Sequence, residues 1–179
     1  MTAVQCKFLR NAMRGAVAIN GGTLFARACV SSGNRGEGFT AIDQGSVVEL
    51  EGCSSTGNYI GCEACFGGKM RALNVDISET RNQGVGVHNR GEIVMRECTA
   101  SRCQQSGVRV QDVGSTLEAH ACEFMRNGQC GAFVSRGSVV TVRGCRSAEN
   151  GECGYFAELE AQMTVSASTS ERDLSLIHI

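Results

Sequence analysis

Short runs of alternating apolar and polar residues recur along this chain of 179 residues. Examples are GVRVQD at 107–112, STLEAHAC at 115–122 and GSVVTVRGC at 137–145. A period of two places successive side chains on opposite faces of a β-strand. Glycine and asparagine interrupt the alternation as turn residues do, and no amphipathic run of helical length occurs. The pattern therefore predicts an all-β chain built from short strands.

The turns follow a fixed period. One glycine series, with a step of 23 residues, comprises Gly22, Gly45, Gly68, Gly91, Gly114 and Gly137. A second series with the same step comprises Gly15, Gly38, Gly61, Gly84 and Gly107, and it continues after one extra residue through Gly131 and Gly154. A repeat of this length is the signature of a solenoid. We expect about seven coils of 23 residues, each with three short strands that stack in parallel about 4.8 Å apart.

Cysteine and asparagine mark most coils, with the asparagine five residues after the cysteine. The cysteine column comprises Cys6, Cys29, Cys53, Cys98, Cys122 and Cys145, and the asparagine column comprises Asn11, Asn34, Asn58, Asn127 and Asn150. Cysteine behaves as a small buried hydrophobe, so the first column predicts an internal ladder of free thiols. Stacked amides can bond one another, so the second predicts a hydrogen-bonded ladder at a turn. In the irregular coils we expect Asp76 in place of cysteine and Cys103 in place of asparagine.

The strand after each second-series glycine has small or apolar first and third residues in every coil, which predicts that they face inward. Its middle residues are chemically mixed and are expected to face outward. They are Val17, Thr40, Glu63, Gly86, Arg109, Phe133 and Phe156.

The unit Cys-x4-Asn-x3-Gly followed by a short strand resembles the coils of right-handed parallel β-helix proteins of the pectate-lyase-like superfamily. The resemblance covers residues 1–168 and implies the fold. It does not imply one activity, because lyases, hydrolases, phage tail proteins and interaction modules share this coil. The left-handed hexapeptide helix fits poorly, since 23 is not a multiple of six.

The two ends of the chain look interrupted. We expect residues 169–179 to form a tail outside the repeat, non-native in origin, because the terminal LSLIHI has no glycine, cysteine or repeat phase and resembles a translated sequencing adapter. A short apolar cap is the alternative. The repeat is already in phase at Cys6 without a preceding capping segment, which complete solenoids need. We therefore expect a fragment of a longer β-helix.

The composition limits the classes of partner and the compartments that we expect for this chain. A net charge of −1 disfavours nucleic-acid binding, and the lack of any apolar run of 18 residues disfavours a membrane span. The chain has 11 cysteines, an odd number, and no signal-peptide pattern. Both observations favour free thiols and an intracellular, reducing compartment, and leave localisation otherwise open.

The Cys62-x-x-Cys65 pair suggests zinc or redox chemistry. On a strand, residues three apart face opposite sides, so we expect Cys62 inside and Cys65 outside. We therefore expect neither a metal site nor a cofactor. The strongest outward polar cluster is Glu63, His88, Arg109 and Asp112, whose residue types resemble a lyase site with an arginine base and an acidic calcium ligand. A solvated face with weak ion pairs is the alternative.

We expect a non-catalytic scaffold or binding module that presents a flat outer face to protein or glycan. Phe133 and Phe156, stacked outward in adjacent coils, are the expected contact patch. The alternative is a carbohydrate-active enzyme, either a polysaccharide lyase or a glycoside hydrolase, with its site in the polar cluster or in missing coils. Asp43 and Asp112 lie about 14 Å apart in this arrangement, too far for a glycosidase pair at roughly 5–9.5 Å.

Overall fold

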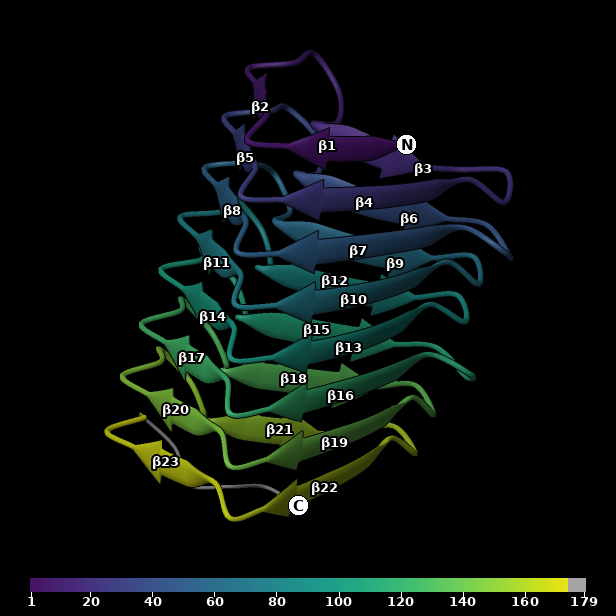
Figure 1. Ribbon diagram of the computed structural model, residues 1–179. Helices are drawn as coiled ribbons and strands as arrows, with labels where there is room; N and C mark the ends of the chain where they lie inside the picture. The colour runs from purple at the N-terminus through teal and green to yellow at the C-terminus, as the bar shows by residue number, and fades with distance from the viewer. Residues whose placement is uncertain (174–179) are drawn as a thin grey trace.

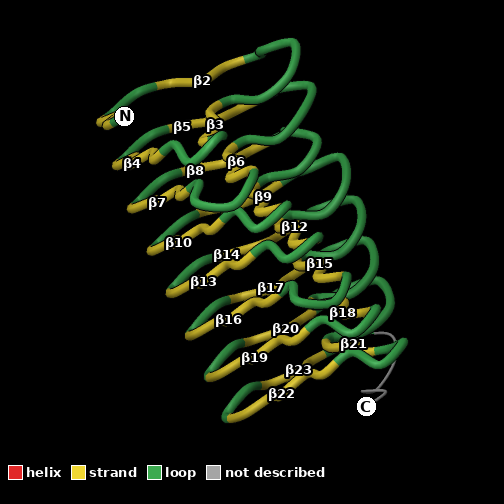
Figure 2. The backbone as a smooth tube through the Cα atoms, turned by 90° about the vertical axis from the view of Figure 1, so that its right-hand side faces the viewer, coloured by secondary structure: helices red, strands yellow, loops and turns green. Residues whose placement is uncertain are grey.

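A computed structural model describes residues 1–173 and shows a right-handed parallel β-solenoid of about seven turns (Figure 1). This stretch contains 23 strands and no helix. It therefore contains no helix long and apolar enough to cross a membrane. The strands form three parallel sheets, and successive coils lie directly above one another (Figure 2). The predicted fold class is confirmed.

Each sheet takes one strand from every coil. Sheet A contains β1 (Thr2–Val4), β4 (Thr23–Arg27), β7 (Val47–Glu51), β10 (Lys69–Leu73), β13 (Glu92–Arg96), β16 (Thr116–His120), β19 (Val139–Arg143) and β22 (Gln162–Ser166). Sheet B contains β2 (Lys7–Leu9), β5 (Val30–Ser32), β8 (Ser54–Thr56), β11 (Asp76–Ser78), β14 (Thr99–Ser101), β17 (Glu123–Met125), β20 (Arg146–Ala148) and β23 (Thr169–Glu171). Sheet C contains β3 (Ala16–Ala18), β6 (Phe39–Ile42), β9 (Cys62–Cys65), β12 (Val85–His88), β15 (Val108–Gln111), β18 (Ala132–Ser135) and β21 (Tyr155–Ala157).

The corners between sheets A and B and between sheets B and C have the same construction, a residue with positive φ followed by an inward side chain. Before the cysteine column these residues are Gln5, Ala28, Gly52, Asn74, Glu97, Ala121, Gly144 and Ala167, with φ between 50° and 60°. Before the asparagine column they are Arg10, Gly33, Gly57, Glu79, Arg102, Arg126, Glu149 and Arg172, with φ between 53° and 66°. The left-handed conformation costs a non-glycine residue about 1–2 kcal/mol. The inward side chains that follow must therefore stabilise the corners.

The cysteine column stabilises the first corner. Each buried thiol donates a weak hydrogen bond to the carbonyl two residues earlier, as Cys29 does to Arg27 at 3.4 Å and Cys145 to Arg143 at 3.4 Å. In the last coil Ser168 Oγ makes the same bond to Ser166 at 3.0 Å. All 11 cysteines are free, and Cys6 in the first coil is the exposed one. The column therefore acts by packing and by capping carbonyls.

One irregular coil differs from the prediction. The sheet B register pairs Ser54 with Asp76, so Val75, and not Asp76, stacks on Cys53. Val75 is buried in the core, whereas Asp76 is exposed and accepts a hydrogen bond from Thr99 at 2.8 Å. The step along the sheet is 24 residues from Val30 to Ser54 and 22 from Ser54 to Asp76, which moves the aspartate out of the cysteine column.

The asparagine column forms the predicted ladder. Asn34 Nδ2 donates to Asn58 Oδ1 at 2.8 Å, and Asn127 Nδ2 donates to Asn150 Oδ1 at 3.0 Å. Thr80 and Cys103 interrupt it in the middle coils. At the far end Asn150 donates to Asp173 Oδ1 at 2.9 Å.

The predicted boundary at residue 168 falls inside the last coil, because β23 pairs with β20 and Asp173 extends the asparagine ladder. Residues 174–179, including the whole of LSLIHI, lie outside the described residues.

A glycine precedes each sheet C strand because the ladder leaves no space there. At Gly38 an added Cβ would lie 2.7 Å from Asn58 Nδ2 and 2.6 Å from the Gly61 carbonyl oxygen.

Asn58→Ala should lower the free energy of unfolding by about 3 kcal/mol, because it leaves the buried backbone N–H of Asn34 without its acceptor and removes the side-chain bond to the Ser31 carbonyl. Asn11→Ala, at the exposed end of the ladder, should lower it by less than about 1 kcal/mol. Urea unfolding followed by circular dichroism measures both. Equal losses would contradict the ladder as a source of stability.

Thiol titration tests the cysteine column. Without reductant, the denatured chain should react with eleven equivalents of a thiol reagent, since every cysteine is free. In the native protein one thiol, that of Cys6, should react fast, because the other ten are buried. Cys6→Ser should remove the fast phase. Fewer than eleven thiols in the denatured chain would contradict the free ladder.

Candidate functional site

The outer face of sheet C carries a polar cluster at the carboxyl ends of β9 and β12. Glu63 and Cys65 lie two residues apart on the same face of β9, while the intervening Ala64 and the preceding Cys62 belong to the core cluster. His88, the last residue of β12, lies directly opposite Cys65 in the parallel ladder. Cys65 lies outside the core cluster, as the alternation predicts, yet it is buried.

These three side chains lie close together. His88 Nε2 lies 3.2 Å from Glu63 Oε1, and Cys65 Sγ lies 4.0 Å from Glu63 Oε2. The carboxylate, thiol and imidazole atoms all lie within 4.8 Å of one another. Glu63 was expected to face outward into solvent, but only 6% of its surface is exposed. The cluster is therefore a buried site on the outer face of the sheet.

Neighbouring groups determine the protonation of the cluster. The hydrogen bond with Glu63 raises the pKa of His88, and burial opposes that rise. Burial, followed by the negative charge of Glu63, raises the pKa of the Cys65 thiol to about 12. Cys65 is therefore a neutral thiol at neutral pH, next to a carboxylate held by a histidine.

Two further contacts orient the imidazole. Asn89 Nδ2 lies 2.9 Å from His88 Nδ1, on the far side of the ring from Glu63. The Phe66 ring meets the His88 ring edge to face, with centroids 6.0 Å apart. The histidine thus has a polar partner at each nitrogen and an aromatic ring beside it.

The third member of the predicted polar cluster, Arg109, lies away from Glu63. Its guanidinium carbon lies 5.0 Å from the centroid of the Phe133 ring, a cation–π contact. Phe133 in turn stacks on Phe156, with centroids 5.5 Å apart and an interplanar angle of 16°. The two phenylalanines stack on the outer face and are partly exposed, and their role as a contact patch stays a prediction.

The four residues of the predicted polar cluster do not converge on one point. His88 and Arg109 line a polar pocket of about 310 Å³ together with Gln83, Gln105 and other residues. Asp112 lies in the turn after β15, where it accepts a hydrogen bond from the backbone of Asn89 at 3.4 Å and pairs with Arg136 at 3.8 Å. Among residues 1–173, Glu63 is thus the one carboxylate within hydrogen-bonding distance of His88.

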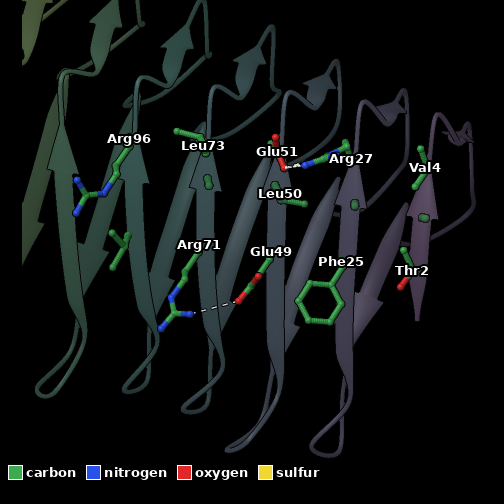
Figure 3. A pocket seen from close by; sticks show the side chains of 14 residues that line it. Thr2, Val4, Phe25, Arg27, Glu49, Leu50, Glu51, Arg71, Leu73 and Arg96 are labelled. Carbon is green, nitrogen blue, oxygen red and sulfur yellow. Dashed lines mark hydrogen bonds and ion pairs between the residues drawn. The ribbon is translucent and has the colours of Figure 1, made fainter.

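A second candidate surface is a groove on the outer face of sheet A (Figure 3). The groove has a volume of about 600 Å³ and is lined by residues of β1, β4, β7, β10 and β13. We call it the sheet A groove. Phe25 from β4 is 46% exposed in it. The sequence predicted a flat outer face and did not indicate this pocket. The alternation shows that Phe25, Glu49 and Arg71 face outward, but no single strand indicates a pocket that spans five strands.

Charged pairs flank Phe25 along the sheet A groove. Arg71 lies 3.3 Å from Glu49, and Arg27 lies 2.7 Å from Glu51, each pair joining adjacent coils (Figure 3). The exposed Arg96 lines the same groove, and its guanidinium makes no ion pair or hydrogen bond within residues 1–173. The groove therefore combines one aromatic ring with guanidinium and carboxylate groups.

Comparisons with known proteins agree with the fold. A family described as a right-handed beta helix region matches residues 1–147. Among solved structures, that of pectate lyase Pel9A is similar, with a TM-score of 0.50 and 16% sequence identity. The match covers 91% of this chain and 64% of the pectate lyase chain, so this chain spans under two thirds of that enzyme's length. A search of curated proteins found no match.

Glu63→Gln should lower the pKa of His88 toward its ordinary value of about 6.5, because it removes the carboxylate that stabilises the imidazolium. In the wild-type protein the raised pKa makes protonation of His88 stabilise the fold. That contribution is complete below the unfolded value and is lost as the pH rises through the folded value.

Nuclear magnetic resonance of the imidazole protons, in buffer containing EDTA, measures this pKa. His120, whose Nε2 lies 3.7 Å from Glu118 on sheet A, gives an internal reference signal, because the substitution is on sheet C. An unaltered His88 titration in Glu63→Gln would contradict the hydrogen bond as the cause.

Proposed function

The chain belongs to the right-handed β-helix family, and from that premise we propose that it is a non-catalytic module that binds an acidic glycan in the sheet A groove. Proteins with this fold have many functions, so the proposal rests on the chemistry of the site. The observation that carries it is the groove of about 600 Å³ with the exposed ring of Phe25 among charged side chains.

The shape and chemistry of the groove suit a saccharide chain. It crosses five parallel strands, so an extended polymer can contact several coils at once. An exposed aromatic ring offers an apolar face on which a sugar ring can stack. The flanking pairs Arg71–Glu49 and Arg27–Glu51 offer donors and acceptors for hydroxyl groups at the two edges of such a chain.

The charge of the groove favours an acidic sugar. Three arginines, Arg27, Arg71 and Arg96, face two glutamates, Glu49 and Glu51. Guanidinium groups bind carboxylates in a bidentate geometry, with two parallel hydrogen bonds. The Arg96 guanidinium has no competing partner among the described residues. The structural similarity to a pectate lyase, an enzyme named for its action on pectate, supports the same class of ligand.

A carbohydrate-active enzyme is the second candidate, and the hydrogen-bonded Glu63–His88 pair is the observation that favours it. A buried carboxylate beside an imidazole is a plausible acid–base pair. A glycosidase needs a second carboxylate at about 5–9.5 Å, and Asp112 is engaged by the Asn89 backbone and Arg136 instead. The binding module therefore has the better support.

Two substitutions in the groove test the proposal. Phe25→Ala should weaken pectate binding by about fivefold, or ~1 kcal/mol, through loss of stacking. Arg96→Gln should weaken it by about tenfold, or ~1.4 kcal/mol, through loss of a charge-assisted bond. Affinity electrophoresis and isothermal titration with pectate oligomers measure both effects.

Each substitution has a matched control outside the groove. Tyr59→Ala removes an aromatic ring that is 44% exposed, close to the 46% of Phe25. Arg143→Gln removes an exposed arginine from the same sheet, in β19. The proposal fails if wild-type protein does not bind pectate, or if the controls weaken binding as much. Depolymerisation of pectate that Glu63→Gln abolishes would establish the enzyme instead.

A further inference from the structure

The cluster of Glu63, Cys65 and His88 brings three different metal-ligating groups to one place. The period of the strand puts Glu63 and Cys65 on the same face of β9, and the ladder puts His88 opposite Cys65. The expectation of no metal site rested on the Cys62–Cys65 pair, whose sulfurs face opposite sides. The structure instead joins Cys65 to two side chains that no local sequence motif links to it.

The distances match a small four-coordinate ion. Zinc bonds of about 2.0–2.3 Å in tetrahedral geometry place ligand atoms roughly 3.3–3.6 Å apart. The observed separations are 3.2 Å from His88 Nε2 to Glu63 Oε1 and 4.0 Å from Cys65 Sγ to Glu63 Oε2, and one ligand atom from each side chain lies within 4.8 Å of the other two. Small rotations of the side chains therefore bring all three atoms into coordination range.

The surroundings carry excess negative charge. The groups that act on the Cys65 thiol are the carboxylates of Glu63, Glu37 and Asp43 against one guanidinium, that of Arg14. Glu63 itself is 6% exposed, so its charge is screened little by water. A divalent cation would be attracted to this position, and binding of the thiolate and the carboxylate would neutralise it.

An independent observation comes from Thr40, which lies directly opposite Glu63 on β6. Its side chain is fully buried, and its hydroxyl oxygen has no hydrogen-bond partner within the described residues. A buried hydroxyl without a partner is costly, so such a group indicates an additional ligand or water. A water bound to a metal ion beside Glu63 would supply that partner.

The outer contacts also suit a metal-bound histidine. Such a histidine donates its second ring nitrogen proton to a neighbouring acceptor. Asn89 Nδ2 already lies 2.9 Å from His88 Nδ1. A rotation of the Asn89 side-chain amide by about 180° would exchange its nitrogen and oxygen and place the oxygen there as the acceptor. His88 Nε2, which now faces Glu63, would then be free to coordinate.

We propose that Glu63, Cys65 and His88 form a binding site for a divalent transition-metal ion of the zinc type, with water in the remaining position. The ligand set selects the ion, since thiolate and imidazole favour zinc over calcium or magnesium. The site lies on sheet C and is independent of glycan binding on sheet A. Cys62 is not a ligand of the proposed site, because its side chain lies in the core.

Cobalt(II) is the probe, because a cobalt–thiolate bond gives a charge-transfer band in the near ultraviolet. The full chain carries Cys6→Ser to remove the one exposed thiol, and a phosphine keeps the others reduced. We expect one equivalent of cobalt to bind with this band, and zinc to displace it. Cys65→Ser should abolish the band, and Glu63→Gln should weaken cobalt binding at least tenfold.

Cys62→Ala is the matched control, since alanine occupies the same inward position in other coils, as Ala16 and Ala132 do. It should keep the band and the affinity. Metal-free circular dichroism and melting confirm that each variant is folded. A wild-type titration without the band, a band that persists in Cys65→Ser, or a band lost in Cys62→Ala overturns the proposal.

Discussion

The constraint on which this structure depends is the parallel, in-register stacking of coils about 4.8 Å apart. Each side chain lies directly above its equivalent in the next coil, so the molecule is organised in columns along its axis. A column of thiols and a column of amides support corners whose backbone is left-handed at Ala28 or Arg126. Without the bonds within these columns, such corners would be strained wherever a residue other than glycine occupies them.

Stacking also determines where chemistry can arise. In a regular solenoid identical residues stack and form structural ladders, as Asn34 and Asn58 do. Where unlike residues stack, different functional groups meet at ladder distance. Glu63, Cys65 and His88 meet in this way on sheet C, and on sheet A Phe25 lies opposite Glu49, which lies opposite Arg71. Gly86, which has no side chain, lies between Glu63 and Arg109 in their column, and the side chains of Gln83 and Glu63 lie next to it.

The two outer faces differ in their electrostatics. The ion pairs of sheet A are exposed, with 75% of the Arg71 side chain accessible, so each contributes less than about 1 kcal/mol and can be exchanged for a ligand. On sheet C, Glu63 is almost fully buried and its interactions are screened little. The first face therefore suits reversible binding of a polymer, and the second suits a tightly held ion.

The period of 23 residues, the alternation and the Cys and Asn columns were enough to determine the fold, because side chains in a solenoid repeat with the backbone. They also showed that Cys62 faces inward and Cys65 outward. They could not show that Val75 replaces Asp76 in the column, because the change of step from 24 to 22 residues at Ser54 leaves no local signal at Asp76. The burial of Glu63, its contact with His88 and the sheet A groove came only from the tertiary structure, since each depends on packing between side chains more than 20 residues apart.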